Sequence, residues 1–231
     1  MATFRRNNTP HLAILGVFAA IALWLVFKGL STAAIGFYPD IAIHIVILIT
    51  LYFFRGTLQM TPVTYALVVA SMLLHDFGIL GFYGDSPLPL RWDTVTHLAG
   101  GFAAAFLFFG FFKQWMTPKP KSKKYWLLAT VFFAAFGAGA LVEANEFWGY
   151  LRLGFGEGTF YFGTGDTWPG TGSDVDNINV VGGGWINTGY DLTYNVIGIL
   201  LGITASLLAE LANAYWRVRK TRFRKRKKKR N

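Results

Sequence analysis

Three pairs of polar residues, each three or four positions apart, lie in or beside long apolar stretches of the sequence. They are Asp93 with His97, Glu143 with Glu146, and Asp191 with Asn195. Residues at this spacing share one face of a helix. A carboxylate at the centre of a membrane-spanning helix costs about 2.5–3.5 kcal/mol, and such a group marks a functional site by default. The three pairs are therefore the first candidates for chemistry.

The residue types of these pairs favour a divalent metal site. The predicted ligands are Asp93, His97, Glu143, Glu146 and Asp191, with Asn195, His75 and Asp76 in supporting positions. Carboxylates with an imidazole suit Zn, Mn or Fe, whereas carboxylates alone suit Mg or Ca. Helix bundles commonly build such sites from side chains on facing helices. A divalent metal ion of unspecified identity is the one cofactor that the sequence suggests.

Three of these residues are predicted to be catalytic. Glu143 would be the deeper ligand or a general base, Glu146 the second ligand or a proton carrier, and His97 the nitrogen ligand or the acid. Without a metal, carboxylates held close together share a proton and support acid–base chemistry or a proton relay. The sequence has no H-E-x-x-H, E-x-x-H or G-x-S-x-G motif and no cysteine, so enzyme classes defined by those features are not indicated.

Each candidate also has a purely structural explanation. Asp40, Asp93 and Asp191 stand where predicted helices begin, and aspartate is a favoured helix N-cap. His44 could be a packing histidine, and Asn195 could simply hydrogen-bond between helices. The sequence leaves both explanations open.

The elements that would carry these residues are membrane-spanning helices. Hydrophobic residues make up 53% of the 231-residue chain and charged residues 15%, against about 25% charged residues in an average globular protein. Six apolar stretches approach or exceed the roughly 20 residues needed to cross a bilayer. They are 11–30, 40–54, 62–83, 93–112, 125–149 and 191–214. The sequence therefore predicts an all-α fold, a polytopic transmembrane helix bundle of six spans over residues 1–216.

The basic residues predict the orientation of this bundle. Nineteen of the 22 Lys and Arg residues lie near the termini or in alternate connections between the stretches. The positive-inside rule assigns these segments to the cytoplasm. Both termini are therefore predicted to be cytoplasmic, with one long external loop at 152–190 and a basic tail at 217–231. The first stretch has the basic start of a signal peptide, but its length and Lys28 favour a retained span.

Small residues continue the faces on which the polar pairs lie. They are Gly101 and Ala104 after His97, Ala135 and Gly139 before Glu143, and Gly198 and Gly202 after Asn195. Small residues at this spacing allow membrane helices to approach closely. Eleven of the 12 acidic residues also fall on the external side or in the outer half of a predicted span. We therefore expect the pairs to face one another in a polar cavity that is open to the outside.

Three motifs on successive spans resemble a known family. They are D-x-x-x-H-x-x-x-G in "DTVTHLAGG", E-x-x-E in "EANEFW" and D-x-x-x-N-x-x-G in "YDLTYNVIGILLG". Together they resemble the VanZ-like membrane proteins and the related group that includes the bacterial inner-membrane protein YjdF. Glu146 matches the YjdF-like form, because VanZ-like members more often have E-x-x-Q. The resemblance implies a small multi-span protein of a prokaryotic cell envelope, and for VanZ-type members an association with glycopeptide resistance.

Three classes of function fit these features. The first is an envelope enzyme that acts on a lipid or lipid-linked substrate with metal or carboxylate chemistry. The second is a structural or regulatory membrane subunit, and the third is a cation- or proton-coupled transporter, which the absence of repeated halves disfavours. The predicted partners are membrane lipids, with anionic lipid at the basic tail. The tail lies directly after a span, so a sequence-specific nucleic-acid partner is not expected, and no protein partner is indicated.

Overall fold

The part of the chain that the structure describes folds into a bundle of six long helices. The computed structural model describes residues 8–32, 38–116, 122–153 and 183–228. Its elements are α1 (Thr9–Thr32), α2 (Tyr38–Phe54), α3 (Pro62–Asp76), the short 3-10 helix η2 (Phe77–Leu80), α4 (Trp92–Trp115), α5 (Ser122–Leu153) and α6 (Gly183–Lys228). The described residues contain no strand. The all-α prediction is confirmed.

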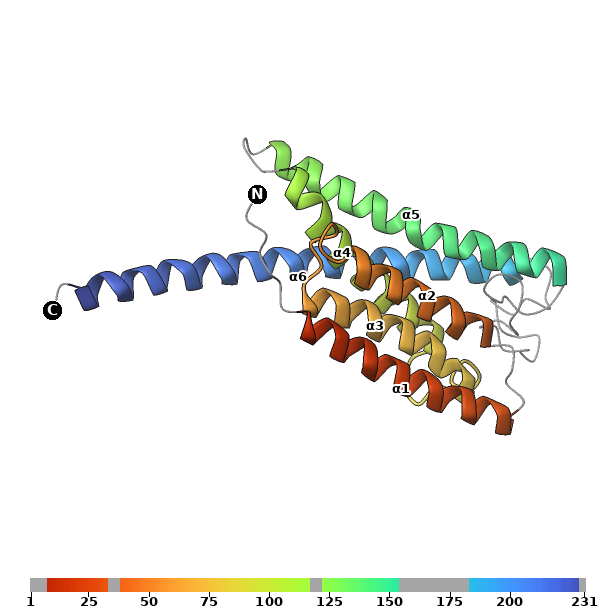
Figure 1. Cartoon of the computed structure of the whole chain (residues 1–231). Coiled ribbons are helices and arrows are strands. Elements are labelled where there is room, and N and C mark those ends of the chain that lie inside the picture. Colours follow the sequence, from red (N-terminus) through yellow and green to blue (C-terminus); the bar gives the residue numbers. More distant parts are fainter. Residues whose placement is uncertain (1–7, 33–37, 117–121, 154–182, 229–231) are drawn as a thin grey trace.

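Consecutive long helices run in opposite directions along the bundle (Figure 1). We call the end where α3 stops and α4 starts the site end, and the opposite end the tail end. The first residue of α1 and the C-terminal half of α6 both lie at the tail end (Figure 1). Because six helices alternate in direction, the chain returns to the end at which it began, as the sequence predicts.

Five of the six helices are long and apolar enough to cross a membrane, and α2 is a shorter apolar helix of 17 residues. Large apolar side chains such as Phe27, Phe53 and Leu141 are exposed on the bundle surface. A water-soluble protein rarely exposes so much apolar surface, whereas lipid solvates it. The structure is thus that of a polytopic membrane helix bundle.

Helices α4 and α6 touch through glycines. A Cβ atom added at Gly101 would lie 2.5 Å from the carbonyl oxygen of Asn195, and one at Gly198 would collide with the carbonyl oxygen of Leu98. Gly202 faces the backbone of Phe102 in the same way. The two backbones are therefore in direct contact, as the small residues in the sequence predict.

The connections differ from the prediction at two places. The external loop predicted at 152–190 is shorter, because α5 continues to Leu153 and α6 already begins at Gly183; residues 154–182 lie outside the described part of the chain. A buried hydrogen bond from Asn187 to Asp191 supports this early helical turn. At the other end, α6 continues through the predicted tail to Lys228, since Lys and Arg are good helix formers.

Candidate metal site

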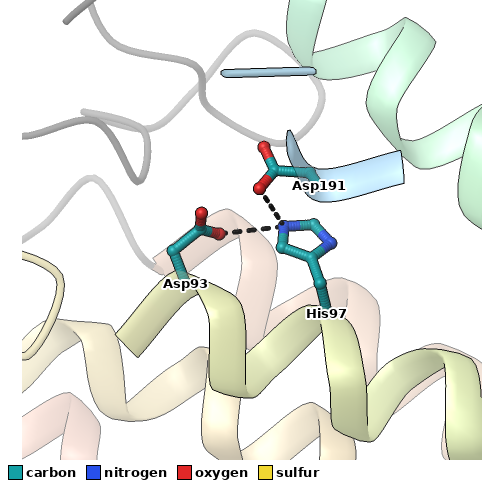
Figure 2. Close-up of side chains that lie close together, drawn as sticks. All are labelled: Asp93, His97 and Asp191. Atoms are coloured by element: carbon teal, nitrogen blue, oxygen red, sulfur yellow. Dashed lines mark ion pairs between the residues drawn. The ribbon is translucent and has the colours of Figure 1, made fainter. Parts of the chain in front are cut away.

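The imidazole of His97, on α4, is held between carboxylates from three helices. Its Nε2 lies 2.9 Å from Oδ1 of Asp93 and 3.6 Å from Oδ1 of Asp191, on α6. Figure 2 shows both side chains directed at this one nitrogen. The other nitrogen, Nδ1, lies 3.1 Å from Oε1 of Glu143, on α5. Each ring nitrogen therefore faces a carboxylate.

The carboxylates of this cluster are almost completely removed from solvent. The exposed fraction of the residue is 4% for Asp93, 0% for Asp191, 1% for Glu143 and 5% for Glu146. The guanidinium of Arg91 lies 3.9 Å from Asp93, but that side chain is half-exposed. Four buried carboxylates thus surround one imidazole.

Asparagines on α6 fix the orientation of two carboxylates. The Nδ2 of Asn195 donates to Oε1 of Glu143 over 3.2 Å, and the Nδ2 of Asn187 donates to Oδ2 of Asp191 over 2.7 Å. Asn195 therefore occupies the supporting position that the sequence suggests. Asn187 was missed, although its spacing of four residues from Asp191 signals a shared helix face.

The alternative explanation by helix capping is wrong for Asp191. This residue is well inside α6, which begins at Gly183. It is wrong for the other two as well: Asp93 lies in the first turn of α4, after the N-cap Arg91, and Asp40 lies inside the first turn of α2. A carboxylate in a first turn interacts favourably with the helix dipole. For Asp93 and Asp40 this local effect coexists with their contacts to histidines.

Two overlapping groups of side chains in the described residues have metal-ligand geometry. One is Asp93, His97 and Asp191; the other is His97, Glu143 and Glu146, and in each the ligand atoms lie within 4.8 Å of one another. Both groups contain His97, the first on its Nε2 side and the second on its Nδ1 side. A neutral imidazole offers one lone pair, so it can bind a metal on one side while its other N–H donates to a carboxylate.

A cavity of about 450 Å³ distinguishes the two sides of His97. It lies between α2, α3, α4, α5 and α6, and its polar lining includes His97, Glu143, Glu146 and Asn195. Asp93 and Asp191 do not line it. The glutamate side of His97 therefore faces open space, and the aspartate side is packed inside the protein.

Away from the polar groups, the cavity wall is apolar. It is formed by aliphatic and aromatic side chains that include Ile47, Leu51, Val68, Leu107 and Phe108. The cavity thus combines a charged end with an apolar end. This division suits an amphipathic molecule better than a small hydrophilic one.

The two remaining predicted supporting residues do not join the His97 cluster. His75 and Asp76 form separate pairs with residues of α2: His75 with Asp40 at 3.4 Å and Asp76 with His44 at 2.7 Å. Tyr83, which the sequence did not single out, lies 2.9 Å from Nδ1 of His75. His44, His75 and Tyr83 line the same cavity as His97.

Comparison with known proteins gives a family but no activity. The family model described as "Predicted membrane protein (DUF2238)" matches residues 10–211. The chain therefore belongs to this family of membrane proteins, which agrees with the helix bundle. The family description names neither the VanZ-like nor the YjdF-like proteins, so that resemblance stays a prediction. No curated protein and no solved structure matches the chain.

Proposed function

We propose that the cluster around His97 binds one divalent metal ion and that the protein is a metal-dependent enzyme acting on a lipid or lipid-linked substrate of the cell envelope. The observation that carries the proposal is the convergence of four buried carboxylates on one imidazole beside a cavity. Buried carboxylates at this separation repel one another unless a cation or shared protons balance their charge. A divalent cation balances two of them and uses the nitrogen that His97 offers.

The ion would lie on the glutamate side, between Glu143, Glu146 and Nδ1 of His97. This side faces the cavity, so a bound substrate could reach the metal there. Oε2 of Glu143 is buried and has no hydrogen-bond partner among the described residues, while Oε1 is oriented by Asn195. An unsatisfied buried carboxylate oxygen is costly, and coordination of a cation would satisfy it.

The aspartate side would orient the ring. Oδ1 of Asp93, 2.9 Å from Nε2, would accept from Nε2–H and so favour the tautomer whose Nδ1 carries the lone pair, while Oδ1 of Asp191, at 3.6 Å, lies beside the same nitrogen without a hydrogen bond. In this arrangement His97 rotates little, since both of its nitrogens are engaged. The two aspartates therefore shape the site without being ligands of the ion, which narrows the five-ligand prediction from the sequence to three cavity-facing ligands.

The chemistry would take place at the charged end of the cavity. A bound divalent ion supplies Lewis-acid activation of an ester, phosphoester or similar bond. Glu146, which also lines the cavity, would bind the ion through one carboxylate oxygen and accept a proton from an attacking water through the other, and the apolar walls would hold an acyl or isoprenoid chain. The metal-free alternative, acid–base chemistry by the carboxylates and His97 alone, predicts no bound ion.

The proposal also includes the orientation of the protein in the membrane and its relation to the VanZ-like and YjdF-like proteins. We take the site end to face outward and the termini to be cytoplasmic, because the basic residues gather at the tail end. The substrate would then come from the outer leaflet of a prokaryotic cell membrane. The D-x-x-x-H, E-x-x-E and D-x-x-x-N motifs support kinship with the VanZ-like and YjdF-like proteins.

Metal analysis of the purified protein tests the binding step. We expect about one equivalent of Zn, Mn, Fe or Mg, and removal of Glu143 or His97 to reduce the affinity by at least ~10-fold. The test variants are Glu143→Gln and His97→Ala. The matched control is Glu210→Gln, because Glu210 pairs with Lys113 toward the tail end. Wild-type protein that holds no stoichiometric ion after incubation with each of these metals would refute the metal site.

Turnover tests the enzymatic step. The protein would be reconstituted in vesicles made from the total envelope lipids of its source cells, loaded with the metal that it binds, and the lipids followed by mass spectrometry. We expect a metal-dependent product that Glu143→Gln does not form. Stoichiometric metal without any product would instead support a structural or transport role for the site.

A further inference from the structure

A second cluster of ionisable side chains lies on the other wall of the cavity. It contains Asp40 and His44 from α2, and His75 and Asp76 from α3. The two imidazole rings are 5.4 Å apart and nearly perpendicular. None of these residues takes part in the metal site proposed above.

Each histidine of this cluster is backed by a buried aspartate. Nδ1 of His44 lies 2.7 Å from Oδ1 of Asp76, and Nε2 of His75 lies 3.4 Å from Oδ2 of Asp40. The aspartates are 0% and 3% exposed, whereas both histidines are part-exposed and line the cavity. A buried carboxylate behind an imidazole fixes its tautomer and its orientation. This arrangement is the one found where histidine transfers protons to or from a bound molecule.

The two histidines differ in what their second nitrogen does. Nδ1 of His75 is hydrogen-bonded to the hydroxyl of Tyr83 over 2.9 Å, so both of its nitrogens are engaged in holding the wall together. His44 is bonded through Nδ1, and its Nε2 points away from Asp76. Because the ring lines the cavity, Nε2 is the atom through which His44 can exchange a proton with a bound molecule.

His11 shows how a packing histidine looks in this bundle. It is 4% exposed, its Nε2 contacts the carbonyl oxygen of Met60 at 3.1 Å, and its ring rests against Tyr65. It does not line the cavity. His11 packs against a backbone carbonyl, which carries no net charge. Placing a buried aspartate behind a histidine costs more free energy, because the carboxylate charge must be removed from water.

The geometry points to His44 as the general acid of the reaction, acting from the α2 side of the cavity, with Asp76 as its positioning residue. This inference rests on the proposed function. It assigns the substrate class as an ester or phosphoester of a lipid, because such a substrate has a leaving oxygen that must be protonated. The pair of His75 and Asp40 connects α3 to α2 beside His44 and has a structural role.

The proton balance of the step uses water as the second reactant. The oxygen of water forms the new bond to the acyl carbon or phosphorus, and the proton that it loses passes to Glu146. The bond to the leaving oxygen breaks as that oxygen takes the proton from Nε2 of His44. Return of the proton from Glu146 to His44 through solvent restores both groups, so one water is consumed for each alcohol and acid formed.

Three single variants test this assignment: His44→Gln, Asp76→Asn and the control His11→Gln. In the vesicle assay described above, we expect His44→Gln to lower kcat by ~100-fold or more and to leave the bound metal at the wild-type level. His11→Gln should change neither. Asp76→Asn should also keep the metal, and nitrogen NMR of isotope-labelled histidine, recorded at a pH high enough that the ring is neutral, should show the Nε2–H tautomer of His44 replacing Nδ1–H. The chain has four histidines, so the signals can be assigned by single substitutions.

The outcomes separate this inference from the proposed function. Wild-type turnover that His44→Gln retains in full, while Glu143→Gln abolishes it, refutes the role of His44 alone. A loss of metal in His44→Gln equal to that in Glu143→Gln also refutes it, because the second cluster would then only support the metal site. Absence of turnover by metal-loaded wild-type protein refutes the enzymatic function, and the role of His44 with it.

Discussion

The contact between α4 and α6 predicts that adding a single methyl group at Gly101 disturbs the metal site. A Cβ atom there would lie 2.5 Å from the carbonyl oxygen and 3.3 Å from the carbonyl carbon of Asn195, and 3.1 Å from the amide nitrogen of Ile199. These are backbone atoms and cannot rotate away. To restore an ordinary contact distance of roughly 3.5 Å, α6 must move by about 1 Å. Because Asn195 bonds Glu143 over 3.2 Å, that displacement breaks the hydrogen bond that orients the ligand.

The expected size of the effect follows from overpacking. Forcing a methyl group into a closed contact costs about 1–3 kcal/mol, and 1 kcal/mol corresponds to a change in Tm of roughly 2–4 °C for a chain of 150–250 residues. Gly101→Ala should therefore lower the Tm of the detergent-solubilised protein by about 2–12 °C and weaken metal binding by at least ~10-fold. The matched control is Gly137→Ala on α5, where an added Cβ has no atom within 4 Å.

The control separates packing from helix propensity. Both substitutions replace glycine by alanine inside a helix, which by itself favours the helix by up to about 1 kcal/mol. Thermal unfolding followed by tryptophan fluorescence and metal titration by calorimetry would compare the two variants. If Gly101→Ala keeps the Tm and metal affinity of Gly137→Ala, the helices are not in the close contact described here and the reasoning fails.

Three further predictions concern charge and orientation. The chain contains no cysteine, so single cysteines can report its topology. A membrane-impermeant thiol reagent should label Asp85→Cys in intact cells and Thr57→Cys only after permeabilisation. Labelling of both from one side would contradict the topology. Removing 221–231 should reduce the fraction of protein that inserts with its termini inside vesicles rich in phosphatidylglycerol, because each nearby basic residue contributes about 1 kcal/mol of attraction to anionic lipid. Protease protection would measure this fraction. An unchanged fraction would exclude this role for the tail. Asp191→Asn should raise the Tm of the chelator-treated protein, because it removes one of four crowded carboxylates. The same variant should weaken metal binding. A lower Tm would show that the carboxylates do not repel one another enough to destabilise the protein.

Helical periodicity and charge predict the fold well because both signals are local. Apolar length identifies the spans, the basic residues give the common side of the termini, and the glycines after His97 and Asn195 indicate where helices touch. The helix starts are less predictable. The segment before Asp191 is rich in Gly and Asn, which local propensity assigns to a loop, but burial of Asn187 against Asp191 makes it helical.

The division of the polar residues into two clusters was not predictable from spacing. The sequence places His75 and Asp76 at the same depth as His97, and depth alone suggests one site. Which residues meet depends on the order of the helices around the bundle, because α2 lies beside α3 and supplies the partners Asp40 and His44. That order is set by packing between distant segments, and a single sequence carries no direct signal for it.

Close helix packing brings buried charged groups together at the site end of the bundle. The contact of α4 and α6 at Gly101 and Gly198 brings the first turn of α4 beside the part of α6 that contains Asp191, and it thereby brings Asp93 and Asp191 to the same imidazole nitrogen. Helix packing and charge repulsion are therefore opposed at this end, because closer helices increase the unfavourable free energy of repulsion between the buried carboxylates. A protein selected only for stability would replace these carboxylates by apolar residues of similar size, which is often neutral or stabilising by about 1–4 kcal/mol. Their presence beside a cavity is therefore the observation that most supports the proposed binding of a cation and a substrate.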